Sequence, residues 1–199
     1  MRVIAGIYRS RILRSLKGMS LRPTSDRLRE TLFNVLGHDL SGRRFVDVFA
    51  GTGAIGIEAL SRGASEVVFI ENHAPAATLI RKNLQSLEIT TGATITTADA
   101  VAGLEKLARK HRSDGITYDY VYLDPPYAER GEYSRVLRLL GAANFLAQDA
   151  AVIAEHSRGF APPEKAGRLE RARVLQQGDA VLSFYRHVPS DNGTEFCAE

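Results

Sequence analysis

From Arg43 onward, short apolar runs alternate with stretches whose apolar residues recur at helical spacing. The runs predict strands over residues 45–49, 67–70, 94–97, 118–123 and 151–154, and the stretches between them predict helices over 54–61, 75–87, 100–111 and 133–140. Strands separated by helices favour an α/β fold, a parallel sheet covered by helices on both faces. Residues 172–176 and 180–187 flank Gln177-Gly178-Asp179, a hairpin pattern that adds antiparallel strands at one edge.

The first 30 residues are strongly basic. They carry eight arginines and lysines against Asp26 and Glu30, a net +6, so the other 169 residues sum to −3 within a total of +3. A cationic arm on a weakly acidic body is typical of a polyanion binder, although a solvated tail can have the same charge. Apolar residues interleaved with the arginines favour an ordered arm.

These patterns divide the chain into three parts. A basic N-terminal arm and a helix occupy residues 1–37, with Thr24 or Ser25 as the predicted N-cap and Gly37 as the stop. The alternating strands and helices form one α/β domain over 38–188, and residues 189–199 form a polar tail.

Composition narrows the class of protein further. No apolar run approaches the roughly 18 to 20 residues that span a bilayer, and Cys197 is the one cysteine, which excludes an intrachain disulfide. The five histidines lack metal-ligand spacing. We therefore expect a cytoplasmic monomer with no metal and no membrane contact, and we expect His73 and His156 at the surface.

A glycine loop follows the first predicted strand, in the segment Asp47-Val-Phe-Ala-Gly51-Thr-Gly53-Ala-Ile-Gly56. Glycines at this spacing permit a tight turn and close approach of the backbone to a nucleotide. The loop alone does not separate a nicotinamide cofactor from S-adenosylmethionine. Asp47 favours S-adenosylmethionine, because a carboxylate attracts its sulfonium and amino groups but repels a pyrophosphate.

Acidic residues end the next two strands. Glu71 follows Gly51 by 20 residues, where an acid that binds ribose hydroxyls belongs. Asp99 is a candidate for the adenine amine, with the backbone N–H of Ala100 beside it. Asp99 fits equally well as the N-cap of the helix that it precedes.

The fourth strand ends in Asp124-Pro125-Pro126-Tyr127, and consecutive prolines hold a turn rigid. The lone pair of an exocyclic base amine is delocalised into the ring. The Asp124 carboxylate and the Pro125 carbonyl can accept both amine hydrogens and turn that lone pair toward a methyl group, while Tyr127 can stack on an extruded base. This interpretation makes the four residues the predicted catalytic turn.

The segments DVFAGTGAIGIEALSRGA, IEN, TADA and LDPPY resemble motifs of class I methyltransferases. Together with RVIAG and LRPTSDRLRETLFNVLG near the N-terminus, they resemble the RsmD family of 16S rRNA guanine-N2 methyltransferases, from about Arg2 to His187. The resemblance implies a Rossmann-like fold with a seven-stranded, mostly parallel sheet and one antiparallel strand. It also implies S-adenosyl-L-methionine as cofactor and N2 methylation of one guanine, the family's guanine 966, in 16S rRNA of the small ribosomal subunit.

The resemblance and the residues together give the candidate sites. The cofactor set is Asp47, Ala50, Gly51, Thr52, Gly53, Gly56, Glu71, Asn72, Asp99, Ala100 and Asp124. The RNA-binding set is Arg9, Arg11, Arg14, Arg22, Thr24 and Arg29. Two positions depart from the family pattern: Ser10 replaces a glycine of the arm, and His73 replaces an acid after IEN.

Three other functions compete with this interpretation. A DNA adenine-N6 methyltransferase uses the same proline turn, but the chain lacks a recognisable target-recognition domain. A nicotinamide-dependent oxidoreductase is disfavoured by Asp47 and by the turn. A non-catalytic RNA-binding module is disfavoured because Asp47, Glu71 and Asp124 are all present.

Overall fold

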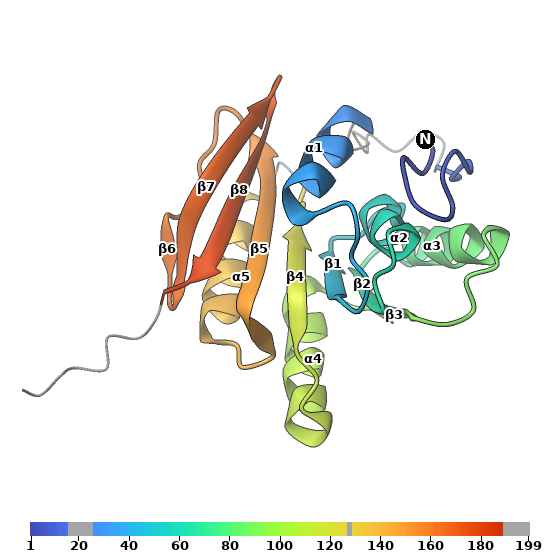
Figure 1. The fold of residues 1–199 in the computed structure, drawn as a ribbon. Coiled ribbons are helices and arrows are strands. Elements are labelled where there is room, and N and C mark those ends of the chain that lie inside the picture. The colour runs from blue at the N-terminus through green and yellow to red at the C-terminus, as the bar shows by residue number, and fades with distance from the viewer. Residues whose placement is uncertain (16–25, 127–128, 189–199) are drawn as a thin grey trace, which may run out of the picture.

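The computed structural model describes residues 1–15, 26–126 and 129–188 of the chain. An eight-stranded sheet forms its centre, with the strand order β3-β2-β1-β4-β5-β8-β7-β6 (Figure 1). The strands are β1 (Arg44–Val48), β2 (Glu66–Glu71), β3 (Ala93–Thr97), β4 (Tyr118–Leu123), β5 (Leu146–Ser157), β6 (Lys165–Ala166), β7 (Leu169–Gln177) and β8 (Ala180–His187). The helices are α1 (Asp26–Leu36), α2 (Ala54–Ser61), α3 (Ala74–Ser86), α4 (Ala100–Asp114) and α5 (Arg130–Ala142).

Strand direction locates the site. Strands β1 to β5 run parallel to one another, and β8 runs antiparallel to β5. The chain goes from β1 outward to β2 and β3, then returns to β4 on the other side of β1. Ligands of such sheets bind beyond the carboxyl ends of the strands at this reversal. The loops after β1 and β4 are therefore the expected walls of a site.

The α/β class and the mostly parallel sheet are confirmed, but the expected strand count was too low by one. The eighth strand, β6, has two residues and pairs antiparallel with β7. Consequently both β8 and β6 run against the parallel set, where the expectation had one reversed strand. A polar strand of two residues leaves no apolar pattern to detect. Strand β5 is also longer than predicted, because exposed Gln148 and Asp149 interrupt its apolar run.

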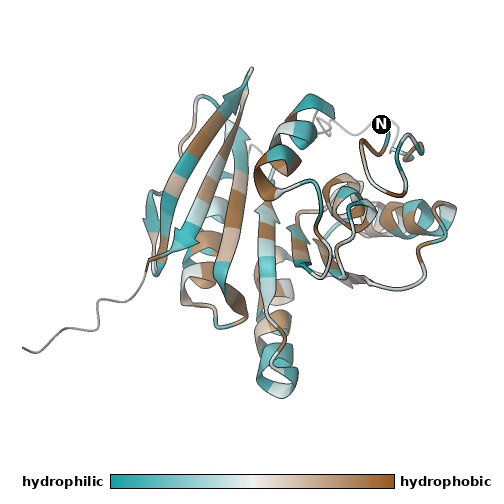
Figure 2. Cartoon of the chain, viewed as in Figure 1, coloured by the Kyte–Doolittle hydropathy of each residue, from teal (hydrophilic) through white to brown (hydrophobic). Residues whose placement is uncertain are grey.

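Helices cover both faces of the sheet. On one face α1, α2 and α3 pack through apolar side chains such as Leu32, Ile57 and Ile80. On the other face α4 and α5 pack through Leu104 and Leu137. Figure 2 shows apolar residues concentrated along β5, whereas the far end of α4 is hydrophilic. No helix in the described ranges has the length and apolar character needed to span a membrane.

The described part of the arm is an ordered hairpin. Arg2 and Ile12 form an antiparallel bridge, and the Ser10 amide donates to the Val3 carbonyl at 2.9 Å. Ser10 has φ +67°, the left-handed conformation that a glycine adopts at low cost. The serine therefore keeps the turn, at a cost of roughly 1 kcal/mol. Val3 and Leu13 are buried in the same core as α1 and α2.

Glu58 and Ser61 of α2 anchor the arm. The Glu58 carboxylate accepts the amides of Ile4 at 2.8 Å and Ala5 at 3.0 Å, and the Ser61 carbonyl accepts the Ile7 amide at 2.8 Å. A Cβ added to Gly6 would lie 1.8 Å from the Ser61 carbonyl oxygen, so only glycine fits there. The arm is thus fixed to the helix that follows the glycine loop.

Candidate active site

The glycine loop has the backbone that its sequence predicted. Gly51 and Gly53 have φ of +54° and +77°, and the Gly53 amide donates to the Ala50 carbonyl at 2.7 Å. A Cβ on Gly56 would lie 2.3 Å from the Phe69 ring, so this glycine lets α2 pack closely on β2. The three glycines therefore serve turn formation and helix packing, the two requirements of a nucleotide loop.

Asp47, on β1, is 2% exposed, and its Oδ2 accepts the Gly56 amide at 2.9 Å. Burial raises its pKa from 3.8 to about 8, and the nearby Glu71 adds to this, whereas the Gly56 hydrogen bond acts in the opposite direction. A buried carboxylate of this kind gains most from a cationic partner. The site therefore fits the positive end of S-adenosylmethionine and does not fit a pyrophosphate.

The pKa of Asp47 makes stability depend on pH. The unfolded chain releases this proton near its ordinary pKa of 3.8, while the folded protein holds it to about 8. The stabilisation is therefore complete below about pH 4 and is lost as the pH rises toward 8. We expect Asp47→Asn, which is neutral throughout, to be the more stable protein at pH 8 by at least about 1 kcal/mol.

Thermal unfolding of both proteins between about pH 4.5 and 9 measures this effect. The wild type should lose stability as the pH rises, and the variant should lose less. Asp99→Asn serves as the control, because Asp99 is exposed and asparagine is an equally good N-cap. Parallel pH profiles for the wild type and Asp47→Asn would contradict the prediction.

Glu71 ties the ends of β1 and β2 together. Its Oε2 accepts the Gly51 amide at 2.7 Å and its Oε1 accepts the His73 amide at 2.8 Å. An ionised carboxylate has about four acceptor positions, so two stay available for ribose hydroxyls. His73 is exposed, as expected, and the departure at this position leaves the Glu71 contact to its backbone in place.

The remaining cofactor candidates lie around the same edge. Asp99 is the N-cap of α4 and accepts the Ala102 amide at 3.0 Å, which bears out the capping alternative. Ala100 is buried and Asn72 is exposed. The Thr52 carbonyl accepts from the Asn83 side chain at 3.0 Å.

The proline turn begins at the end of β4. Asp124 is half-buried, Pro125 is buried and Pro126 is exposed, while Tyr127 lies outside the described residues. Burial raises the pKa of Asp124 well above 3.8, and the charges of Glu155 and Asp47 raise it further. Strand order β2-β1-β4 brings Glu71, Asp47 and Asp124 to neighbouring strand ends at one edge of the sheet.

The arm arginines differ in their surroundings. Arg9, Arg11 and Arg14 are exposed, although the Arg11 guanidinium also donates to the Ser86 carbonyl at 2.7 Å. Arg29 is 0% exposed, and its Nη2 donates to the Arg2 carbonyl and to Asp26, each at 2.7 Å. In this conformation Arg29 holds the arm and presents no surface to RNA. Arg22 and Thr24 lie outside the described residues.

Two residues of this region, Glu155 and Asn83, were not predicted from the sequence. Glu155, at the end of β5, is buried and accepts the Tyr122 hydroxyl. Asn83 is buried and bonds the backbone of Arg14 as well as that of Thr52, so it joins the arm to the glycine loop. Glu155 could have been predicted, because it is an acid near the end of an apolar strand, as Asp47 and Asp124 are. No sequence pattern indicates the role of Asn83.

His156 corrects an expectation. It is 3% exposed rather than at the surface, with Nε2 2.9 Å from the Ser183 hydroxyl and Nδ1 3.0 Å from the Ser157 carbonyl. Burial lowers its pKa, which favours a neutral ring.

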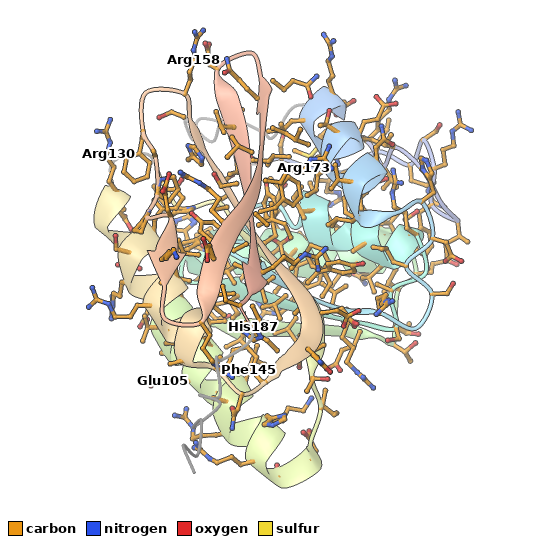
Figure 3. The ribbon with its side chains drawn as sticks, turned by 60° about the vertical axis from the view of Figure 1, so that its left-hand side comes forward. Glu105, Arg130, Phe145, Arg158, Arg173 and His187 are labelled. Atoms are coloured by element: carbon orange, nitrogen blue, oxygen red, sulfur yellow. The ribbon has the colours of Figure 1, made fainter. Side chains whose placement is uncertain are left out.

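Two arginines project outward near this end of β5 (Figure 3). They are Arg130, which lies over the Phe160 ring, and Arg158.

A doubly wound sheet with a glycine loop, acids at the ends of β1 and β2, and a proline turn after β4 defines a class I methyltransferase. The sequence model described as "Conserved hypothetical protein 95" matches residues 1–186. The chain therefore belongs to this family, that of the RsmD-like methyltransferases, and the resemblance of its motifs is confirmed.

Individual relatives and a solved structure support the same family. The chain is 35% identical to the Bacillus subtilis protein named "Putative rRNA methyltransferase YlbH" over 94% of this chain and 98% of that one. It is 36% identical to the Escherichia coli K12 "Ribosomal RNA small subunit methyltransferase D" over 77% of this chain and 73% of that one. The solved Escherichia coli structure titled "Putative methyltransferase yhhF" superposes with a TM-score of 0.78 at 32% identity, over 94% of this chain and 97% of that one.

Proposed function

We propose that this chain transfers a methyl group from S-adenosylmethionine to the N2 amine of a guanine in 16S rRNA, the one numbered 966 in the family's substrate. The proposal is carried by one observation, the position of Asp124 on the strand next to Asp47 at a single sheet edge. Asp47, which suits the cationic part of the cofactor, therefore lies on the strand next to Asp124, which suits the amine of the base. The Escherichia coli relative, named for the small ribosomal subunit RNA, supports this substrate.

Different residues of the chain bind the cofactor and align the amine. Asp47 faces the positive charge of the cofactor, and Glu71, which the Gly51 amide holds in place, binds the ribose hydroxyls. S-adenosylmethionine, when bound, supplies a methyl group already activated by its sulfonium. The chain then has to align the amine for in-line displacement, and alignment is a large source of rate.

Asp124 and the Pro125 carbonyl accept the two amine hydrogens, which directs the nitrogen lone pair toward the methyl carbon. The C–N bond forms as the C–S bond breaks, and the nitrogen must then lose a proton. Because burial and neighbouring acids raise the pKa of Asp124, its carboxylate is a stronger proton acceptor than an exposed one.

Methyl transfer to defined nucleic acids tests the proposal against its rival, DNA adenine-N6 methylation. Purified protein is incubated with labelled S-adenosylmethionine and either 16S rRNA, assembled small subunits or adenine-containing DNA. The products are digested and their nucleosides identified by mass spectrometry. We expect N2-methylguanosine from an RNA substrate. N6-methyladenosine, or transfer to DNA alone, would contradict the proposal.

The exposed arginines of the arm predict salt-dependent RNA binding. Each arginine that neutralises a phosphate releases counterions, with a log–log slope of roughly 0.7 to 0.9 per contact. Replacing Arg9, Arg11 and Arg14 together with Ala is expected to reduce the slope of RNA affinity against salt by about 2 to 3 units. The rate at saturating RNA should change little, because these side chains do not align the amine.

A salt series of RNA binding for the wild type and this triple variant measures the slope. The matched control removes the same charge from α4 through Lys106, Arg109 and Arg112, which are exposed on the part of the helix that extends away from the site. Equal slopes for the wild type and the arm variant would mean that RNA is held elsewhere.

A further inference from the structure

An aromatic cluster lies where β5 ends. Phe160, in the segment after β5, packs against Tyr133 of α5 with the ring centroids 5.0 Å apart. The His156 ring stands edge-on to both, at 6.1 Å from Phe160 and 6.5 Å from Tyr133. The Tyr133 hydroxyl donates to the Glu155 carbonyl at 2.6 Å, which fixes the cluster on β5. Phe160 is half-buried, so part of its ring faces the surface.

The segment that carries Phe160 is held at both ends. The Arg158 amide donates to the Asp179 carbonyl at 2.9 Å. Further along, the Tyr185 hydroxyl donates to the Pro163 carbonyl at 2.8 Å. A backbone that is already fixed in the free protein loses little conformational freedom when a ligand binds. The segment is therefore preorganised to present its side chains.

Two exposed arginines flank the cluster. Arg130, the first residue of α5, has its guanidinium carbon 5.4 Å from the centroid of the Phe160 ring. Arg158 directly follows β5, and both side chains project outward (Figure 3). Within the described ranges neither guanidinium has an acid within ion-pair distance, whereas Glu164 of the same segment already pairs with Arg171 at 2.6 Å. We call Arg130, Arg158 and Phe160 together the β5 patch.

The β5 patch lies at the same edge of the sheet as Asp124. In the parallel pair β4 and β5, Leu123 is opposite Ala154, and β5 continues to Ser157. The patch therefore projects beyond the strand end that Asp124 follows. The glycine loop and Glu71 lie on the other side of β4, at β1 and β2. RNA that presents a base to Asp124 is thus expected to cross the side of the site that the cofactor residues leave free.

We propose that the β5 patch binds the RNA backbone beside the target nucleotide, with the Arg130 and Arg158 guanidinium groups on phosphates. Phe160 acts as a positioning residue that holds Arg130. The planar fork of N–H donors on a guanidinium matches a phosphate, and such contacts fix the position of a nucleic acid. The inference rests on the proposed function for its substrate. It adds a second RNA contact, because the arm is anchored on α2, on the cofactor side of the site.

Binding of small ribosomal subunits, isolated from cells that lack the gene, tests the patch across a salt series. The variant Arg130→Ala/Arg158→Ala is expected to lower the log–log slope of affinity against salt by about 1.4 to 1.8 units, since each phosphate contact contributes roughly 0.7 to 0.9. In steady-state kinetics the loss is expected in KM for the subunits, by about fivefold or more, rather than in kcat.

Two further variants separate charge from position. Arg109→Ala/Arg112→Ala removes two exposed arginines from the far part of α4 and is expected to keep the wild-type slope. Phe160→Leu keeps both charges of the patch. It is expected to weaken binding at fixed salt and to leave the slope unchanged, because the number of neutralised phosphates stays the same.

Cross-linking identifies what the patch touches. Arg158→Cys, in a chain whose one cysteine is removed by Cys197→Ser, carries a photoreactive label at the patch. On the subunit this label is expected to cross-link to 16S rRNA. Cross-links to ribosomal protein alone would overturn the inference.

The inference and the proposed function fail in different ways. If the wild type methylates guanine in these subunits but Arg130→Ala/Arg158→Ala keeps the wild-type slope, the β5 patch does not bind RNA and the proposed function stands. If the wild type leaves the guanine unmethylated while the double variant loses slope and the label reaches 16S rRNA, the proposed function is wrong and the RNA contact stands.

Discussion

Replacing Asp124 with Ala is expected to lower the single-turnover rate of methyl transfer by about a hundredfold or more, the scale of losing a positioned electrostatic group. Asp124 directly follows β4, which lies on one side of β1, whereas Glu71 ends β2 on the other side of β1. Asp124 is therefore expected to act on the amine and not on the ribose. Affinity for S-adenosylmethionine should therefore stay within about threefold, which corresponds to less than about 1 kcal/mol.

Rapid-quench kinetics with saturating RNA and calorimetry with S-adenosylmethionine measure the two quantities. Asp124→Asn is the matched variant, because its amide keeps a carbonyl acceptor for the amine and loses only the charge. We expect its rate to lie between those of the wild type and Asp124→Ala. If cofactor affinity falls in proportion to rate, Asp124 binds the cofactor and the division of work given above is wrong.

Replacing Glu58 with Ala is expected to destabilise the protein by about 3 to 5 kcal/mol, the cost of breaking a buried ion pair by removing one partner. Glu58 is 0% exposed and pairs with Arg62 at 2.9 Å. Arg62 lies over the Phe33 ring, with its charge centre 4.7 Å from the ring centroid. The variant leaves that cation buried and removes the acceptor of the Ile4 and Ala5 amides.

Urea unfolding gives the free energy, and hydrogen exchange at Ile4 and Ala5 reports whether the arm is released. The control is Glu105→Ala on α4, whose pair with Arg109 is long, 3.9 Å, and exposed at the surface (Figure 3). Such pairs contribute about 0.5 kcal/mol or less. A loss of less than about 1 kcal/mol for Glu58→Ala would mean that the arm is not anchored through this carboxylate.

The parallel core was predictable because its signals are local. An apolar run closed by an acid, followed by helical periodicity, located β1, β2 and β4 to within a residue or two. β6 was missed because two residues on a sheet edge bury almost nothing. The first part of β5 was missed because exposed Gln148 and Asp149 interrupt its apolar run, at the point where the pairing with β4 shifts register.

The site residues could be predicted where the residue type and its position in the sequence indicate a chemical role. Asp47, Glu71 and Asp124 stand at strand ends, and parallel strands bring such ends together. Glu58 and Asn83 hold the arm through contacts with residues more than 50 positions away, and no local pattern indicates those contacts. Arg29 illustrates the converse, since a run of arginines does not reveal which member is buried.

The central claim is methylation of guanine N2 in 16S rRNA, and nucleoside mapping of that RNA tests it most directly. 16S rRNA is isolated from cells with the gene, without it, and complemented with the wild type or with Asp124→Ala. Mass spectrometry of its fragments then locates each methylated base. The account predicts one N2-methylguanosine that disappears on deletion and returns only with the wild-type gene. An unchanged 16S rRNA, or loss of a methyl group from an adenine instead, would contradict it.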